Sequence, residues 1–148
     1  TVRVAAGAGF DYETEAYIDI NVTATSQDGS SSSQTFTLAI TDINEAAVSD
    51  ISDSDAATNN VNEDAAIGTS VGITAFASDA DGTATVAYSL SDDAGGRFAI
   101  DTATGEVTVA GALDRETSAN YSIAVKASSS DGSTSTKSFV VALHDIAE

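Results

Sequence analysis

The sequence predicts an all-β protein built from tandem domains, and three observations support this. Apolar residues alternate with polar ones along several short segments, and no segment sustains the i, i+3, i+4, i+7 spacing of an amphipathic helix. The chain also repeats itself at an offset of 103 residues, since residues 10–45 align without a gap on residues 113–148 with 17 identities in 36 pairs. A period of this length is a whole domain. We therefore predict that residues 1–45 are the C-terminal half of one repeat and residues 46–148 a complete repeat.

The half repeat is predicted to form one β-hairpin. Ile18, Ile20 and Val22 alternate with polar residues, and a second alternating run contains Phe36 and Leu38. The Asp-Gly step between the runs is a turn signal. Because an isolated hairpin is marginally stable in water, we expect another polypeptide segment to cover its apolar face. The candidates are the upstream strands of the same repeat in a longer chain, or strands of another copy in a head-to-tail assembly.

The full repeat is predicted to form about seven short strands. A first strand is expected between Val48 and Val61. The later ones are expected around residues 71–75, 86–90, 98–100, 107–109, 121–127 and 139–143. Seven short strands in about 100 residues are typical of an immunoglobulin-like Greek-key β-sandwich. The chain has no Cys and no Trp, which excludes an antibody-type domain.

Composition excludes several function classes. With 23 acidic and 5 basic residues the formal charge is −18, which argues against nucleic acid and anionic membranes as partners. No apolar run is long enough to insert into a membrane. The absence of Cys removes thiolate metal sites and cysteine nucleophiles. His144 is the only His and belongs to the outward face of its strand, and no nucleophile-turn motif is present, so we predict no enzymatic activity.

Acidic motifs fall at predicted strand ends, and this placement carries the functional signal. They include Asn62-Glu63-Asp64, Asp79-Ala80-Asp81-Gly82 and Leu113-Asp114-Arg115-Glu116. For any one carboxylate the plainer interpretation is a solvated acidic surface. Carboxylates gathered without basic partners repel one another, however, and a hard cation such as Ca²⁺, with 6–8 oxygen ligands, relieves that repulsion. The EF-hand template starting at Asp79 fails, because its position 6 is Ala84.

These motifs, taken in order, resemble those of the cadherin family. LDRE at residues 113–116, Asp42-Ile43-Asn44-Glu45 as a DxND-like linker, and Asp79-Ala80-Asp81 match family motifs, and residues 98–105 are similar to the family's F-x-I-D-x-x-T-G stretch. The resemblance implies calcium at the junction of the half and full repeats. Its ligands there would be Asp11, Glu13, Asn44, Glu45, Glu63, Asp79 and Asp81, with Asp42 in the linker motif. The equivalent set at the end of the full repeat would be Asp114, Glu116, Asp145 and Glu148.

The sequence also departs from the family pattern. Ser26 and Ser129 stand where the family has a further Asp ligand, and Asp131, two residues on, is either a substitute ligand or a turn residue. Ala147 replaces the linker Asn in the second linker. The Ser/Thr/Ala/Asp-rich composition without Pro is similar to cadherin-like repeats of large bacterial surface adhesins.

The resulting functional prediction is an extracellular, calcium-stiffened spacer repeat of a large adhesin or surface filament, of the kind found in biofilms. It would hold adhesive regions away from the cell. The alternative is a binding module, either for homophilic cell–cell contact or for a surface polysaccharide. An exposed apolar patch would favour this alternative.

Overall fold

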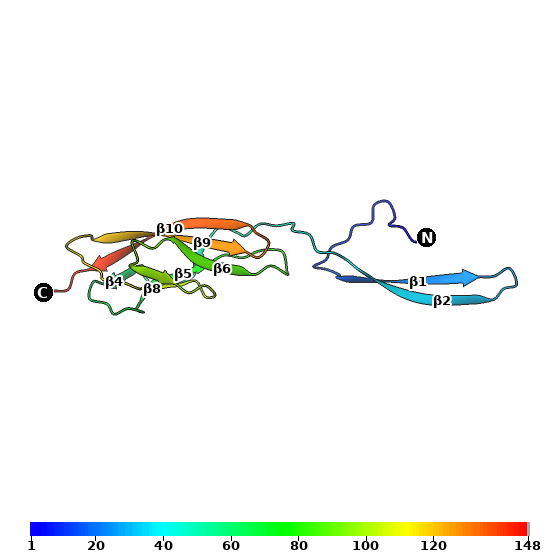
Figure 1. The fold of residues 1–148 in the computed structure, drawn as a ribbon, viewed down its shortest axis with the longest axis horizontal. Helices are drawn as coiled ribbons and strands as arrows, with labels where there is room; N and C mark the ends of the chain where they lie inside the picture. Colours follow the sequence, from blue (N-terminus) through cyan, green and yellow to red (C-terminus); the bar gives the residue numbers. More distant parts are fainter. Residues whose placement is uncertain (148) are drawn as a thin grey trace. The chain divides into compact units, whose positions relative to one another are not determined.

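A computed structural model describes residues 1–147 and contains strands but no helix among them. The chain divides into two compact units, Thr1–Glu45 and Ala46–Glu148 (Figure 1). The first unit contains β1 (Tyr17–Thr25) and β2 (Ser31–Ala39), which pair antiparallel with Ile20 opposite Phe36. The Ser26 N–H donates to the Ser30 carbonyl at 2.8 Å, which closes the turn. The predicted hairpin is therefore present, and its turn contains the predicted Asp-Gly step.

The second unit is a sandwich of two four-stranded sheets (Figure 1). One sheet has the order β4-β10-β9-β6 and the other the order β3-β5-β8-β7. The strands are β3 (Ser52–Asp53), β4 (Asn60–Asn62), β5 (Ser70–Phe76), β6 (Val86–Asp92), β7 (Phe98–Ile100), β8 (Glu106–Val109), β9 (Asn120–Ser129) and β10 (Thr134–His144). Neighbours pair antiparallel except β4, which runs parallel to β10 with Asn62 opposite His144.

The first predicted strand is in fact two short strands in different sheets. β3 pairs with β5, whereas β4 pairs with β10. The Asp53 carboxylate explains the break, because its Oδ1 accepts the N–H of Thr74 at 3.0 Å and that of Asp55 at 3.0 Å. The second of these bonds turns the chain out of the β3 pairing. The split raises the strand count of this repeat above the predicted seven.

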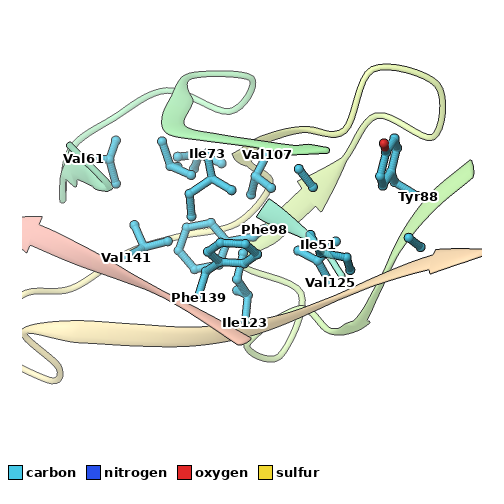
Figure 2. Packing of buried hydrophobic residues seen from close by; sticks show 14 of the residues in the cluster. Ile51, Val61, Ile73, Tyr88, Phe98, Val107, Ile123, Val125, Phe139 and Val141 are labelled. Atoms are coloured by element: carbon cyan, nitrogen blue, oxygen red, sulfur yellow. The ribbon is translucent and has the colours of Figure 1, made fainter. Parts of the chain in front are cut away.

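The core of the second unit lies between the sheets, where alternate residues of β9 and β10 meet those of β5, β7 and β8 (Figure 2). Ile123, Val125 and Val141 are fully buried and face Ile73 and Val107 of the other sheet. Each such side chain contributes about 1.5–3 kcal/mol relative to an exposed one. The period-2 pattern in the sequence therefore identified the buried face correctly.

Gly105 ends the turn between β7 and β8, and the backbone requires a glycine at this position. Its φ is +77°, and a Cβ at this position would lie 2.2 Å from the Ala75 carbonyl oxygen. Its carbonyl accepts the Ala75 N–H at 2.9 Å, so the two backbones approach closely. The Asp101 carboxylate holds the rest of the turn by accepting the N–H groups of Ala103 and Thr104.

Candidate metal centres

Three carboxylates converge near the C-terminal end of the second unit. Single oxygens of Glu63, Asp114 and Glu116 all lie within 4.8 Å of one another. Glu63 directly follows β4, whereas Asp114 and Glu116 belong to the turn that precedes β9. These segments are distant in sequence, and they meet because β10 pairs with β4 on one side and with β9 on the other.

Glu63 connects this cluster to the segment that follows β10. Its Oε2 accepts the Arg115 N–H at 2.7 Å, and its Oε1 accepts the Ile146 N–H at 2.8 Å. The sequence prediction that Glu63 belongs with Asp79 and Asp81 at the first junction is therefore wrong. Those two residues lie near the opposite end of β10, whose eleven residues span roughly 30 Å. Glu63 belongs instead with the LDRE turn of its own repeat.

The pKa values of two carboxyls in this cluster are shifted in opposite directions. The backbone N–H groups of Ile146 and Arg115 lower the pKa of Glu63, because they stabilise its charged form. The Glu116 backbone also acts to lower the pKa of its own carboxyl. Burial and the charges of Glu63, Asp145 and Asp114 outweigh it and raise that pKa. The charge of Asp145 thus reaches the cluster, while Glu148 lies outside the described residues.

The Asp114 turn recurs in the first unit with the same bonds. The Thr117 N–H donates to Asp114 Oδ1 at 2.9 Å and its hydroxyl to Oδ2 at 2.6 Å. The corresponding Thr14 bonds to Asp11 measure 3.1 and 2.8 Å. In both turns the threonine hydrogen bonds lower the pKa of the aspartate. The structure therefore gives the two LDRE-type turns one conformation, 103 residues apart.

A second cluster lies near the N-terminal end of the second unit. Single oxygens of Asp79, Asp81 and Asp131 lie within 4.8 Å of one another. Asp81 is buried and its Oδ2 accepts the Ala46 N–H at 3.3 Å. Asp79 Oδ1 accepts the Asp81 N–H at 3.1 Å, while Asp79 Oδ2 is buried and has no hydrogen-bond partner among residues 1–147. Such an atom is unfavourable unless something else binds it.

The predicted ligands of the first unit are only partly brought together. Glu13, Asp42 and Glu45 line one hollow of about 230 Å³ together with Phe10 and Tyr12. Among the described residues, they do not form a group of converging carboxylate oxygens like the two clusters above. Asp11 and Asn44 do not line this hollow.

Comparison with known proteins identifies the family. The model of the Cadherin domain matches residues 57–144, which is more than half of the chain. The chain belongs to the cadherin family. Rat Cadherin-17 is 38% identical over 146 residues, covering 92% of this chain and 17% of that protein. Human Protocadherin Fat 1 is 37% identical over 123 residues, covering 80% of this chain and 3% of that protein.

A solved cadherin structure has the same architecture. The crystal structure of mouse Cadherin-23 EC22-24 is similar with a TM-score of 0.72 and 28% identity, covering 94% of this chain and 46% of that chain. The predicted all-β, cadherin-like fold is therefore confirmed. The chain spans less than a fifth of the curated relatives named above. Those relatives are animal cadherins, so the link to bacterial adhesins stays a prediction.

Cadherin domains are non-enzymatic adhesion modules of the cell exterior and generally bind calcium. Both clusters of this chain have the chemistry for that ion, since each offers hard carboxylate oxygens. The unpartnered Asp79 Oδ2 supplies an independent sign that a ligand belongs there. Among the described residues no helix is long and apolar enough to cross a membrane.

Asp131 is the member of these clusters that the sequence-based ligand set omitted. The family motif places the aspartate at the position of Ser129, and the Asp-Gly step favours a turn residue. The one available signal was that Asp131 lies two residues from Ser129. Local spacing alone did not show that this turn folds back towards Asp79 and Asp81.

Proposed function

We propose that this chain is a calcium-stiffened, extracellular spacer segment of a larger adhesin or surface filament. One observation carries the proposal: the second unit has a three-carboxylate cluster near each end, and each is hydrogen-bonded to the segment through which the chain enters or leaves. A domain that is rigid at both of its connections keeps its neighbouring repeats at a fixed distance and orientation, which is what a spacer requires.

The hydrogen bonds explain how an ion would order these connections. The Ala46 N–H donates to Asp81 where the chain enters the second unit, and the Ile146 N–H donates to Glu63 where it leaves. A cation bound to either cluster would cancel the repulsion among its carboxylates. The backbone bonds to those carboxylates would then be held in place as well. Calcium is thereby coupled to the order of the entering and leaving segments.

We further propose that residues 1–45 are the C-terminal half of a preceding cadherin repeat. The Asp11–Thr14 and Asp114–Thr117 bonds support this, as do the matching hairpin turns. On the strength of the family resemblance, the first unit and the linkers retain their predicted calcium ligands. These are Asp11, Glu13, Asp42, Asn44, Glu45, Asp145 and Glu148.

The partners proposed for the chain are neighbouring repeats of the same protein and, as an alternative function, other copies in homophilic contact. The observation that favours contact is the exposed apolar face of β1–β2, which includes Val22 and Phe36. These residues align with the buried Val125 and Phe139 of β9–β10, so a missing part of the same sandwich explains their exposure more simply. A polysaccharide partner was predicted from sequence only, and no described feature of the chain supports it.

The spacer proposal is tested by thermal unfolding of the full chain with millimolar Ca²⁺, with a chelator, and with Mg²⁺. Extracellular Ca²⁺ modules bind at roughly 10⁻⁴–10⁻³ M. At about 10–100 times Kd, each ion bound only to the folded state adds roughly 1.4–2.7 kcal/mol. For a domain of this size that raises Tm by several degrees. Mg²⁺ should substitute poorly, since it requires a tighter octahedral shell.

Two variants and a control distinguish the loss of a calcium ligand from the mere loss of one negative charge. Asp79→Asn and Glu116→Gln each remove one charge from one cluster, and we expect each to reduce the calcium-induced rise in Tm. Asp101→Asn removes the same charge from a turn outside both clusters and should retain the full rise. Identical melting curves with calcium and chelator would refute the proposal. In scattering experiments, stiffening should appear as a narrower distribution of molecular dimensions with calcium.

A further inference from the structure

We propose that the turn between β9 and β10 supplies the ligands that complete the calcium site of Asp79 and Asp81: the carboxylate of Asp131 and the hydroxyl of Ser129. This inference rests on the proposed function and assigns ligands that the family motif does not provide in this chain. The motif position itself is Ser129, which cannot offer a carboxylate.

The first supporting observation is the convergence of three carboxylates from two separate segments. Asp79 and Asp81 follow β5, whereas Asp131 lies about fifty residues later in the turn after β9. Their oxygens nevertheless lie within 4.8 Å of one another. Three negative charges at this separation repel one another, and a hard divalent cation among them turns repulsion into attraction.

The second observation concerns Ser129 and is independent of the acidic residues. Ser129 is only 7% exposed, and its Oγ is buried without a hydrogen-bond partner among the described residues. Strand alternation places it on the inward face of β9 with Val125 and Ala127, at the end of the strand next to the Asp131 turn. A buried hydroxyl without a partner requires an explanation, and a bound ion supplies one. Asp79 belongs to the three-carboxylate cluster, and its Oδ2 is likewise buried without a partner in the described part of the chain.

The plainer interpretation is that Asp131 merely stabilises its turn, and the first unit provides a direct comparison. Asp28 occupies the equivalent position, and its Oδ1 accepts the Ser30 N–H at 2.9 Å. Asp131 Oδ1 accepts the Ser133 N–H at 2.6 Å in the same way. Turn stabilisation thus accounts for one bond at both positions. It does not account for the two further carboxylates beside Asp131, which Asp28 does not have among the described residues.

A site of this composition would also order the entry of the chain into the second unit. The Ser133 hydroxyl accepts the Val48 N–H at 2.9 Å, and Asp81 accepts the Ala46 N–H at 3.3 Å. An ion bound by Asp79, Asp81 and Asp131 therefore sits among groups that hold residues 46–48 from two sides. Calcium would fix the β9–β10 turn and this entry segment together.

The test is calcium titration of the full chain by calorimetry, comparing Asp131→Asn with Asp28→Asn. Asparagine keeps the oxygen that accepts the turn N–H in each case, so both variants should fold, and only the charge is lost. We expect Asp131→Asn to weaken one calcium site by roughly tenfold or more, because affinity follows the count of charged ligands. Asp28→Asn should bind like the original chain.

Ser129→Asp provides the complementary variant, since it restores the carboxylate of the family motif. This variant should bind calcium more tightly than the original chain, and unchanged or weaker binding would remove Ser129 from the ligand set. Amide NMR signals of residues 129–133 should also shift on addition of calcium. Equal affinities for Asp131→Asn and Asp28→Asn, in a chain that does bind calcium, would overturn the inference and leave the proposed function standing. A chain that binds no calcium at all would overturn both.

Discussion

The hairpins β1–β2 and β9–β10 come from aligned segments with 17 identities in 36 pairs, and their local structures match closely. The bond that closes the turn measures 2.8 Å from Ser26 to Ser30 and 2.9 Å from Ser129 to Ser133. Their surroundings differ. Val22 is 41% exposed whereas the equivalent Val125 is 0% exposed, and Phe36 is 45% exposed whereas Phe139 is 8%. The two hairpins therefore share one local structure, whereas burial of their apolar side chains requires a second sheet.

The N-terminal segment of the first unit lies beside the apolar face of its hairpin. Val2 and Val4 line a hollow of about 270 Å³ together with Ile18, Ile20 and Leu38 of the hairpin. The Val2-Arg3-Val4 sequence repeats the pattern of Val107-Thr108-Val109 in β8, whose valines are buried against the equivalent hairpin. This likeness supports the proposal that strands like those formed by residues 46–109 cover β1–β2.

The largest expected effect follows from supplying that cover. Joining a second copy of residues 46–105 in front of Thr1, so that Thr1 takes the place of Glu106, should complete the first sandwich. Amides of β1 and β2 should then exchange with solvent at least about a thousandfold more slowly, because a complete domain unfolds at a cost of about 5 kcal/mol or more. Hydrogen-exchange mass spectrometry measures this directly.

A matched extension carrying Ile73→Asp in the added copy is the control, since that residue is fully buried in the original sandwich. It should give no protection, because a charge in the core prevents the second sheet from packing. Equal exchange with and without the correct extension would show that the two hairpins are not equivalent.

A smaller effect is expected when the same substitution is made in each hairpin of the original, unextended chain. Val125→Ala should destabilise the second unit by about 2–3 kcal/mol, because it removes two buried side-chain carbons and leaves a cavity in the core. The equivalent Val22→Ala should change the stability of the first unit by less than about 0.5 kcal/mol, because Val22 is 41% exposed and not enclosed in a core. Chemical denaturation of both variants measures the difference. Equal losses would mean that β1–β2 is covered in solution.

The smallest effect concerns the turn of the uncovered hairpin. Ser30 hydrogen bonds lower the pKa of Asp28 below its ordinary value of 3.8. A carboxyl whose pKa is lowered by folding stabilises the folded turn above the ordinary value, and this stabilisation is lost as the pH falls through the lowered pKa. NMR titration of the Asp28 carboxyl should therefore give a midpoint below 3.8. An ordinary midpoint would show that the turn does not form without a covering sheet.

The sequence predicted those features that are recorded locally. Alternation identified the buried residues of β9 and β10, and the Asp-Gly steps identified both hairpin turns. The two errors of placement arise from pairing between distant segments. The split of the first strand and the position of Glu63 both depend on the parallel pairing of β4 with β10, which no local period records. Asp131 was not included in the predicted ligand set because its proximity to Asp79 and Asp81 also depends on contacts between distant segments.

That pairing of β4 with β10 also determines how the second unit would respond to a pulling force. The bonds from Ala142 to Asn59 and from Glu63 to His144 join the two strands side by side. The chain enters this unit near one end of β10 and leaves from the other. A force applied through the neighbouring segments therefore runs along β10, across the direction of these hydrogen bonds. Under such shear the bonds share the load and must break together, whereas a load at one end would open them one at a time.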